Sequence, residues 1–350
     1  MSQNSEQGAG SLKVFDERFM RFALCQARRG LGMTSPNPAV GAIIVSQGQI
    51  VASGFHERAG EPHAEINALS KRSSLEQAKG ATLYVTLEPC STHGRTPPCT
   101  EAIIRAGLSR VVIGSIDPNP RHSGRGVEVL RQAGLEVVVG ILESECANLN
   151  VGFNKWITTR TPWVIAKVAE TLDGRISRPP GEARQLSNRR SQRLTHYLRS
   201  TVDAILVGGE TVRTDDPQLT IRFVHAQSQP WRAIVTRSGA IPSQAKLLTD
   251  RFADRTLIYR DQSWREIFAD LGDRGVTRLL VEGGGQILGD LLDKREIDEI
   301  WCFLTPYLAG GDKPSFAGAG IGRYEEAIAM ETIRYKQIGS DLLVRGRVRR

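Results

Sequence analysis

Apolar and polar positions alternate along the chain in two successive series of helix-like and strand-like segments. The first series opens at residues 15–29, where Phe19, Phe22 and Ala23 recur at helical spacing. Two apolar runs then flank a polar turn at Gly48, which predicts a β-hairpin. The later segments are, in order, helix 63–72, strand 82–88, helix 96–107, strand 110–116, helix 126–134 and strand 135–140. This alternation predicts an α/β sandwich.

The second series begins after Pro162, and the rhythm breaks just before it, near residues 145–160. Its predicted strands are 163–169, 203–209, 231–237, 255–260, 277–285, 299–306 and 342–348. Its helical patterns lie at 188–199, 263–273 and 285–293. We therefore expect a polar, disordered lead-in (1–14) and two α/β domains, 15–150 and 160–350.

Composition agrees with two soluble domains. The chain has 350 residues, about twice a typical domain length, with 40% hydrophobic and 24% charged residues. No apolar run approaches the roughly 18–20 residues that span a bilayer, and the polar start does not resemble a secretory signal. Five cysteines are few and odd in number, which argues against a disulfide framework. We expect a cytoplasmic protein with no membrane partner.

The net charge of +8 raises the question of nucleic-acid binding. Residues 1–150 are nearly neutral, with 15 Lys/Arg against 14 Asp/Glu, and residues 151–350 carry 31 against 24. The excess basic residues form no run apart from the terminal arginines from Arg345 onward. The distribution favours small phosphorylated ligands over nucleic acid.

One constellation in the first half indicates a metal centre. His63 stands at a predicted helix start, and Cys90 and Cys99 flank a Gly/Pro-rich loop. One imidazole and two thiolates suit tetrahedral zinc with a fourth position left for water, and Glu65 is placed to move that water's protons. The combination of H-x-E with a later P-C is typical of zinc deaminases. His93 could instead be a ligand, whereas His56 is more typical of a pocket residue or a satisfied polar group.

The spacing from Pro89 to Cys99, PC-x3-GRTPPC, resembles the deaminase half of the bifunctional deaminase-reductases of riboflavin biosynthesis. The segments SPNPAVGAIIV, GEPHAE, DPNP and AGLEVVVG are similar to the same family. The resemblance implies a cytidine-deaminase-like α/β/α sandwich with zinc on His63, Cys90 and Cys99. It implies that Glu65 donates and accepts protons and that Asn37 binds substrate.

The second half carries TLDGRIS (171–177), residues 203–222 and LLVEGGGQILGDLL (279–292). Three glycines between a strand and a helix can approach a phosphate, but they are not a G-x-G-x-x-G fingerprint. These segments resemble the reductase half of the same family, which implies a dihydrofolate-reductase-like α/β domain that uses NADPH. The implied cofactor positions are Glu170, Thr211, Asp215, Gly284, Gly285, Gln286, Ile287, Leu288, Gly289 and Asp290. The implied substrate positions are Arg199, Leu219, Arg222 and Glu282, while Lys167, Thr171 and Asp173 lie in the first reductase motif.

Two segments depart from the family pattern. In place of a Ser-x-Trp-Ile-Thr stretch the chain has Ala183, Arg184, Gln185, Leu186 and Ser187. In place of Asp-Ser after a strand it has Thr236 and Arg237. Arg237 either contacts the extra phosphate of NADPH or marks a reductase half that binds differently.

The resemblance implies two consecutive reactions. A zinc-dependent step removes the 2-amino group of 2,5-diamino-6-(5-phosphoribosylamino)pyrimidin-4(3H)-one, and NADPH then reduces the ribosyl group of the resulting 5-amino-6-(5-phosphoribosylamino)uracil to ribityl. The partner is thus a small phosphoribosylated pyrimidine, and a homo-oligomer is compatible with these features. Two alternatives remain: a deaminase with an inactive second domain, and a zinc deaminase or zinc-stabilised module that acts on nucleic acid.

Overall fold

The computed structural model describes residues 3–70, 72–93, 97–176, 185–226 and 228–349. The chain divides into two compact units, Met1–Arg160 (unit 1) and Thr161–Arg350 (unit 2). Among the described residues, no helix combines the length and apolar character needed to cross a membrane.

Unit 1 is a three-layer sandwich around a five-stranded sheet in the order β2-β1-β3-β4-β5. The strands are β1 (Gly41–Ser46), β2 (Gln49–Phe55), β3 (Thr82–Leu87), β4 (Arg110–Ser115) and β5 (Glu136–Val139). Strands β3, β4 and β5 are parallel, while β1 is antiparallel to both of its neighbours. The parallel strands therefore end at one edge of the sheet.

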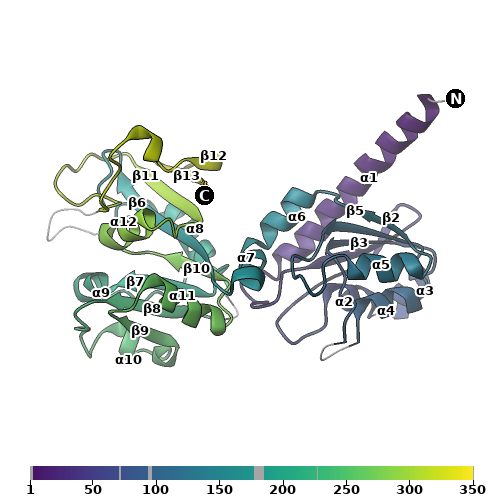
Figure 1. Ribbon diagram of the computed structural model, residues 1–350, viewed down its shortest axis with the longest axis horizontal. Helices are drawn as coiled ribbons and strands as arrows, with labels where there is room; N and C mark the ends of the chain where they lie inside the picture. Colours follow the sequence, from purple (N-terminus) through teal and green to yellow (C-terminus); the bar gives the residue numbers. More distant parts are fainter. Residues whose placement is uncertain (1–2, 71, 94–96, 177–184, 227, 350) are drawn as a thin grey trace. The chain divides into compact units, whose positions relative to one another are not determined.

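Helices cover both faces of this sheet (Figure 1). On one face lie α1 (Gln3–Arg28) and α6 (Glu143–Leu149), which pack apolar side chains against β1, β3 and β4. On the other face lie α2 (Ala64–Leu69), α3 (Arg72–Ala78), α4 (Cys99–Arg105) and α5 (Arg125–Gln132). Helix α7 (Val151–Thr159) ends unit 1.

Two long-range polar contacts close unit 1. Buried Asp16 on α1 accepts hydrogen bonds from the Tyr84 hydroxyl (2.7 Å) and from both terminal nitrogens of Arg110 (2.8 Å each). Buried Asn150 pairs with the backbone of Ala39, donating to its carbonyl (3.0 Å) and accepting from its N–H (2.8 Å). Both contacts satisfy polar groups that burial would otherwise leave without partners.

Unit 2 is built on an eight-stranded sheet in the order β12-β13-β11-β6-β10-β7-β8-β9. The strands are β6 (Trp163–Thr171), β7 (Ala204–Gly208), β8 (Trp231–Thr236), β9 (Thr256–Arg260), β10 (Arg278–Val281), β11 (Glu299–Thr305), β12 (Met330–Ile338) and β13 (Asp341–Val348). The run from β11 to β9 is parallel, and β12 and β13 add an antiparallel hairpin. As in unit 1, parallel strands bring their carboxyl ends to a common edge.

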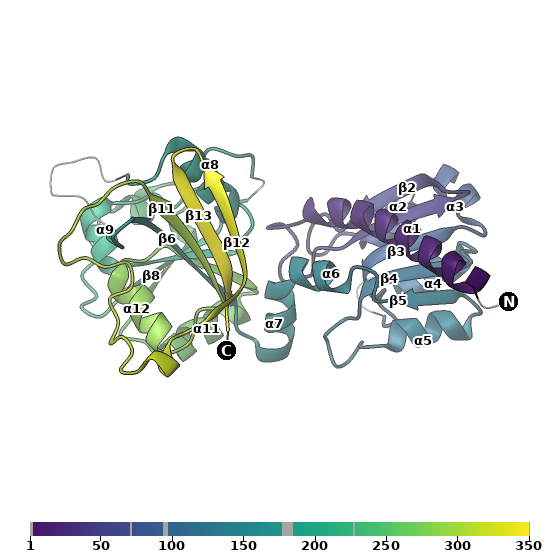
Figure 2. The same cartoon turned by 90° about the horizontal axis from the view of Figure 1, so that it is seen from above.

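Helices also cover both faces of the second sheet (Figure 2). One face carries α8 (Arg189–Arg199), α9 (Gly209–Asp215) and α10 (Lys246–Thr249), and the other carries α11 (Trp264–Asp273) and α12 (Gly285–Asp293). Short 3₁₀ turns occur at η1 (Ala253–Arg255) and η2 (Tyr324–Glu326). Side-chain caps fix two helix starts, because Asn188 accepts from the N–H groups of Arg190 and Ser191 and Ser263 forms a capping box with Glu266.

The structure differs from the sequence prediction at four places. Helix α1 starts at Gln3 and so includes most of the expected disordered lead-in. The sequence predicted a later start, at residue 15, because only residues 19–24 pack apolar side chains on the sheet and show the helical spacing. The segment expected to break the rhythm, 145–160, forms most of α6 and all of α7. Asp215, which lies between the predicted strands 203–209 and 231–237, is the last residue of α9, a helix that the sequence pattern did not predict. Strand β12 was not predicted, because its residues are almost all exposed and leave no apolar pattern.

Candidate active sites

The first half of the candidate metal centre lies at the start of α2. His63 is the residue before the helix, in extended conformation, and Glu65 is in the first turn, with only 3% of its surface exposed. Helix α2 packs directly on β2, because a Cβ at Gly54 would collide with the backbone nitrogen of Ala68. This close approach needs glycine, and it holds the His63–Glu65 turn firmly against the sheet.

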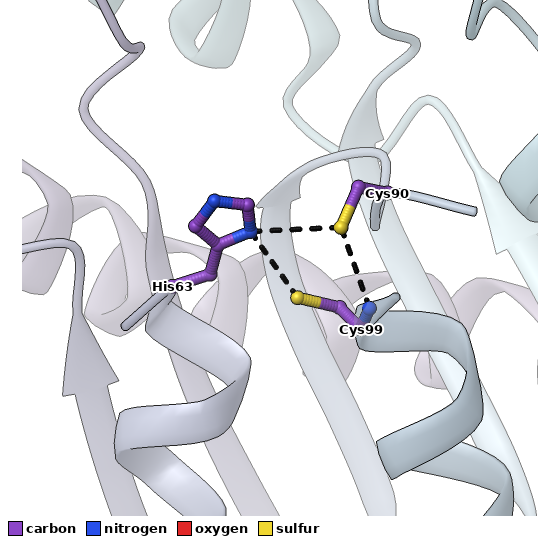
Figure 3. A group of neighbouring side chains, drawn as sticks. All are labelled: His63, Cys90 and Cys99. Atoms are coloured by element: carbon purple, nitrogen blue, oxygen red, sulfur yellow. Dashed lines mark hydrogen bonds between the residues drawn. The ribbon is translucent and has the colours of Figure 1, made fainter. Parts of the chain in front are cut away.

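The second half comes from the carboxyl edge of the same sheet. Cys90 follows β3, and buried Cys99 is the first residue of α4. Figure 3 shows the two thiols converging on the imidazole of His63. His63 Nδ1 lies 3.3 Å from Cys99 Sγ and 3.6 Å from Cys90 Sγ, and the Cys99 N–H donates to Cys90 Sγ at 3.3 Å.

The three donor atoms suit a metal ion, since they all lie within 4.8 Å of one another. Hydrogen bonds from Cys99 and His63 lower the pKa of Cys90, which favours the thiolate, the form that binds metal. The hydrogen bond to Cys90 raises the pKa of His63. One nitrogen and two sulfurs, with no fourth ligand in the group among the described residues, match a catalytic zinc site.

Glu65 faces this donor group and is not part of it. Burial raises the pKa of Glu65 to about 7, although the nearby His63 works in the opposite direction. A carboxyl group that titrates near neutrality can both accept and donate a proton during one reaction.

The two other histidines considered as ligands have different partners. Buried His56 packs edge-on against His63, with ring centroids 5.4 Å apart. Its Nδ1 donates to the Pro62 carbonyl and its Nε2 accepts from the Asn37 amide, each at 3.1 Å, and burial lowers its pKa. His93 is exposed and lies 3.6 Å from Glu101 Oε1. Asn37 is thus linked to the metal group through His56, which contacts His63.

In unit 2 two of the expected substrate positions, Arg199 and Glu282, form a largely buried ion pair. Arg199 on α8 binds Glu282, just after β10, through two contacts, Nε–Oε1 at 2.6 Å and Nη2–Oε2 at 2.9 Å. Burial alone would raise the pKa of Glu282, but the charges of Arg199 and Lys167 outweigh it and hold the pKa at about 2. Burial lowers the pKa of Lys167 on β6, which makes its proton easier to release.

His196, which sequence reasoning missed, joins this cluster. It lies on α8, one turn before Arg199, and is 5% exposed. Its Nδ1 accepts the backbone N–H of Arg222 at 3.1 Å, and its ring packs on Phe223 with centroids 4.5 Å apart. The spacing of three residues from Arg199 on one helix face is the signal that could have indicated it.

Some of the other expected reductase residues bind groups within the protein, and others have atoms that a ligand could bind. Thr171 donates to Asp173, which accepts from the N–H groups of Ala309 and Gly310, so this pair braces a loop. Cys302 Sγ donates to Glu170 Oε1 at 3.1 Å, whereas Glu170 Oε2 is buried with no hydrogen-bond partner among the described residues.

Thr211 and Asp215 lie on α9, where Thr211 is half-buried and Asp215 is exposed. Of the expected substrate residues nearby in sequence, Arg222 is exposed, and Leu219 is buried with a positive φ of 51°. Within the expected phosphate loop, Gln286 is exposed and Ile287 packs against Gly208 and Gly283.

The glycine loop at α12 contains positions of two kinds. Gly284 has open space where a side chain would be, but a Cβ at Gly285 would collide with the Pro314 carbonyl oxygen. Gly289 is similarly close to the backbone of Gly318, and Leu288 is fully buried. Asp290 accepts from the Trp264 indole and pairs with Lys294. Only the first residues of this stretch are therefore open to a ligand.

Of the segments that depart from the family pattern, Ala183 and Arg184 lie outside the described residues. Gln185 accepts a hydrogen bond from Gln192, and Leu186 is buried. Thr236 ends β8 and is buried, whereas Arg237 is exposed at the carboxyl edge, within electrostatic reach of Asp290.

Comparisons with known proteins match both units. Residues 13–115 match the cytidine and deoxycytidylate deaminase zinc-binding region, and residues 162–344 match the RibD C-terminal domain. The riboflavin biosynthesis protein RibD of Aquifex aeolicus is 40% identical over 95% of this chain and 98% of its own, and that of Escherichia coli is 36% identical over 93% and 98%.

Solved structures agree with this assignment. Acinetobacter baumannii RibD has a TM-score of 0.88 at 35% identity and covers 97% of this chain and 100% of its own. A Thermotoga maritima diaminohydroxyphosphoribosylaminopyrimidine deaminase/5-amino-6-(5-phosphoribosylamino)uracil reductase has a TM-score of 0.88 at 34% identity, covering 96% and 99%. The chain belongs to the RibD family of riboflavin biosynthesis, with a zinc-dependent deaminase half and an NADPH-dependent reductase half.

Proposed function

We propose that unit 1 hydrolyses the 2-amino group of 2,5-diamino-6-(5-phosphoribosylamino)pyrimidin-4(3H)-one and that unit 2 reduces the ribosyl group of the product to ribityl. The observation that carries the first step is the convergence of His63 Nδ1, Cys90 Sγ and Cys99 Sγ beside buried Glu65. The activity for which the Thermotoga maritima relative is named supports the choice of substrate.

In the deaminase step His63, Cys90 and Cys99 would hold zinc, which would lower the pKa of water and so supply a nucleophile at neutral pH. The Glu65 carboxylate accepts one proton of the attacking water as the water oxygen bonds to the ring carbon, and gives that proton to the neighbouring ring nitrogen. Glu65 then accepts the second proton, from the added hydroxyl, and delivers it to the amino group as the C–N bond breaks, so that one water is consumed and one ammonia leaves.

We propose that the substrate ring lies beside His56 and Asn37. Both hydrogen bonds of His56 require a neutral ring with its proton on Nδ1, and its lowered pKa keeps it neutral. A neutral His56 fixes the amide of Asn37, because the Asn37 nitrogen donates to the ring and its oxygen is turned away from it. That oxygen can accept a hydrogen bond from a polar edge of the pyrimidine.

In the reductase step the residues around the carboxyl edge of the second sheet orient the substrate. NADPH, when bound, supplies the hydride. We infer that its phosphates would lie near Gly284, because this residue immediately precedes α12 and a helix N-terminus favours negative charge. Lys167, with its lowered pKa, is placed to protonate the sugar oxygen that becomes a hydroxyl, while Arg199 keeps Glu282 ionised.

We also propose that the protein acts on a small molecule, in the cytoplasm. Residues 1–150 are nearly neutral in charge, which supports a small-molecule substrate over nucleic acid. The few, unpaired cysteines support a reducing, cytoplasmic location. Sedimentation of the purified protein would show whether it is a homo-oligomer.

Purified protein tests the two steps separately. Ammonia release from the diaminopyrimidine measures the first step, and NADPH oxidation with the pre-deaminated pyrimidine measures the second. We expect both. Ammonia release without NADPH oxidation would instead support a deaminase with an inactive second domain.

A further inference from the structure

Glu88 is a buried carboxylate that the proposed reaction does not use. It follows β3 and comes two residues before Cys90, and it is 6% exposed. Its Oε2 accepts the backbone N–H groups of Asp117 (3.2 Å) and Gly124 (2.9 Å). Its Oε1 accepts those of Gly126 (2.8 Å) and Val127 (3.3 Å). All four donors belong to one segment, 117–127, which leads into and begins α5.

The two segments also touch through their backbones. A Cβ at Gly126 would collide with the Pro89 carbonyl oxygen and would lie 3.1 Å from Glu88 Oε1. So close an approach leaves no room for any side chain at position 126. The first turn of α5 therefore abuts the residue that precedes Cys90.

Segment 117–127 lies beside the residues that flank Cys90. The half-buried carboxyl of Asp117 has a pKa raised by burial, and the charges of Glu88 and Cys90 contribute to this shift. Asp117 Oδ1 accepts the N–H of Asn119 at 2.8 Å, which fixes the turn. Further along, His122 Nδ1 lies 3.4 Å from Thr92 Oγ1, in the loop between the two cysteines.

We propose that Glu88 is a positioning residue of the deaminase, which holds segment 117–127 at a fixed distance from Cys90 and so sets the affinity for the substrate. This inference rests on the proposed deaminase function. Glu88 neither belongs to the donor group of three nor has a free oxygen to move protons, because both oxygens already accept two N–H groups.

Replacing Glu88 by Gln separates this role from a general effect on folding. An amide nitrogen cannot accept a hydrogen bond, so two backbone N–H groups of segment 117–127 lose their partner and we expect this segment to shift. We expect KM for deamination to rise about tenfold, as the loss of one or two charge-assisted hydrogen bonds would give, with kcat changed less than about threefold. Zinc should stay at one per chain, and reduction of the pre-deaminated substrate should be unchanged.

Three variants accompany Glu88→Gln. Glu88→Asp keeps the charge on a shorter side chain and should recover part of the affinity. Gly126→Ala pushes apart the same contact from the other side and should also raise KM. If the Glu88→Gln protein does not fold, Glu88→Asp replaces it and should raise KM by a smaller factor. Asp16→Asn is the matched control, since Asp16 is an equally buried carboxylate on the opposite face of the sheet, bound to Tyr84 and Arg110. It should lower Tm without changing KM.

Steady-state ammonia release, metal analysis and thermal unfolding on the full chain decide the matter. The inference is overturned if KM in Glu88→Gln and Gly126→Ala stays within twofold of the wild type. It is also overturned if Asp16→Asn raises KM as much, or if zinc is lost, because Glu88 would then act through the fold or the ligands. A wild-type protein that releases no ammonia would instead remove the proposed function itself.

Discussion

The two units carry their reactive groups in different ways. In unit 1 the donor atoms and Glu65 come from two short segments, 63–65 and 90–99, each at a helix start. In unit 2 the cluster of Lys167, Arg199 and Glu282 is assembled from a strand, a helix and a strand end far apart in the sequence. One site is therefore a local motif, and the other depends on the whole sheet.

This difference has an energetic side. The helices that carry the thiols and imidazole of unit 1 are packed on the sheet by their own apolar side chains, so changing a ligand should affect catalysis more than the fold. The Arg199–Glu282 pair of unit 2 is largely buried and already formed within the protein, so removing one partner leaves the other charge without its hydrogen-bonded counter-ion. Substitutions in the two units should thus separate loss of activity from loss of stability.

The largest effect is expected for Cys99→Ser. Serine binds zinc poorly, so zinc content should fall well below one per chain and ammonia release should fall to background. Cys25→Ser, at an exposed cysteine far from the donor group in sequence, is the control and should change neither. Metal analysis together with ammonia release checks the expectation, and full zinc in Cys99→Ser would make His93 the next ligand to test.

Next in size is Glu65→Gln, which keeps the shape of the side chain but cannot carry a proton. Deamination should slow by at least about a hundredfold, the usual contribution of a general acid–base. Zinc content and reduction of pre-deaminated substrate should stay at wild-type values. Loss of zinc in this variant would contradict the proton-transfer role and make Glu65 structural.

In unit 2 we expect Arg199→Met to act mainly on stability. It leaves Glu282 buried without its partner, which should lower the free energy of unfolding of unit 2 by about 3 kcal/mol. Urea unfolding followed by tryptophan fluorescence is suitable, because four of the five tryptophans lie in unit 2. The double variant Arg199→Met/Glu282→Met should recover part of the loss; strictly additive effects would show that the two residues are not coupled.

The smallest effect concerns pH and His196. Burial, with the charges of Arg199 and Arg222, lowers its pKa to about 4, below the value of about 6.5 in an unfolded chain. Its contribution to stability is therefore complete above about pH 6.5 and is lost as the pH falls toward 4, by on the order of 1–2 kcal/mol. Urea midpoints of wild type and His196→Gln at pH 7.5 and 5 test this: the wild type should lose more, and equal losses would contradict it.

Much of this architecture could be predicted from the sequence where the apolar pattern reports burial. Helices α8, α11 and α12 begin and end within one residue of the predicted ranges, because each packs an apolar stripe on the sheet. Strand β12 could not be predicted for the opposite reason: it is an edge strand with exposed side chains, placed by pairing with β13.

The same contrast applies to the sites. His63, Glu65, Cys90 and Cys99 could be predicted, because metal ligands need particular residue types at restricted spacing. Glu88 and His196 act through backbone N–H groups that are distant in sequence, and no local pattern marks which backbone group a side chain will meet. Arg199 and Glu282 could be predicted as site residues only through the resemblance to the family.

The contacts that close unit 1 also bear on the order in which the chain is made. Helix α1 leaves the ribosome before the strands on which it packs, and its buried Asp16 needs Arg110, which is synthesised 94 residues later. The start of β1 likewise waits for Asn150, 111 residues after Ala39. Helix α1 thus gains its buried contacts only after most of unit 1 has been made, and the deaminase unit reaches its final form only when synthesis has passed Asn150.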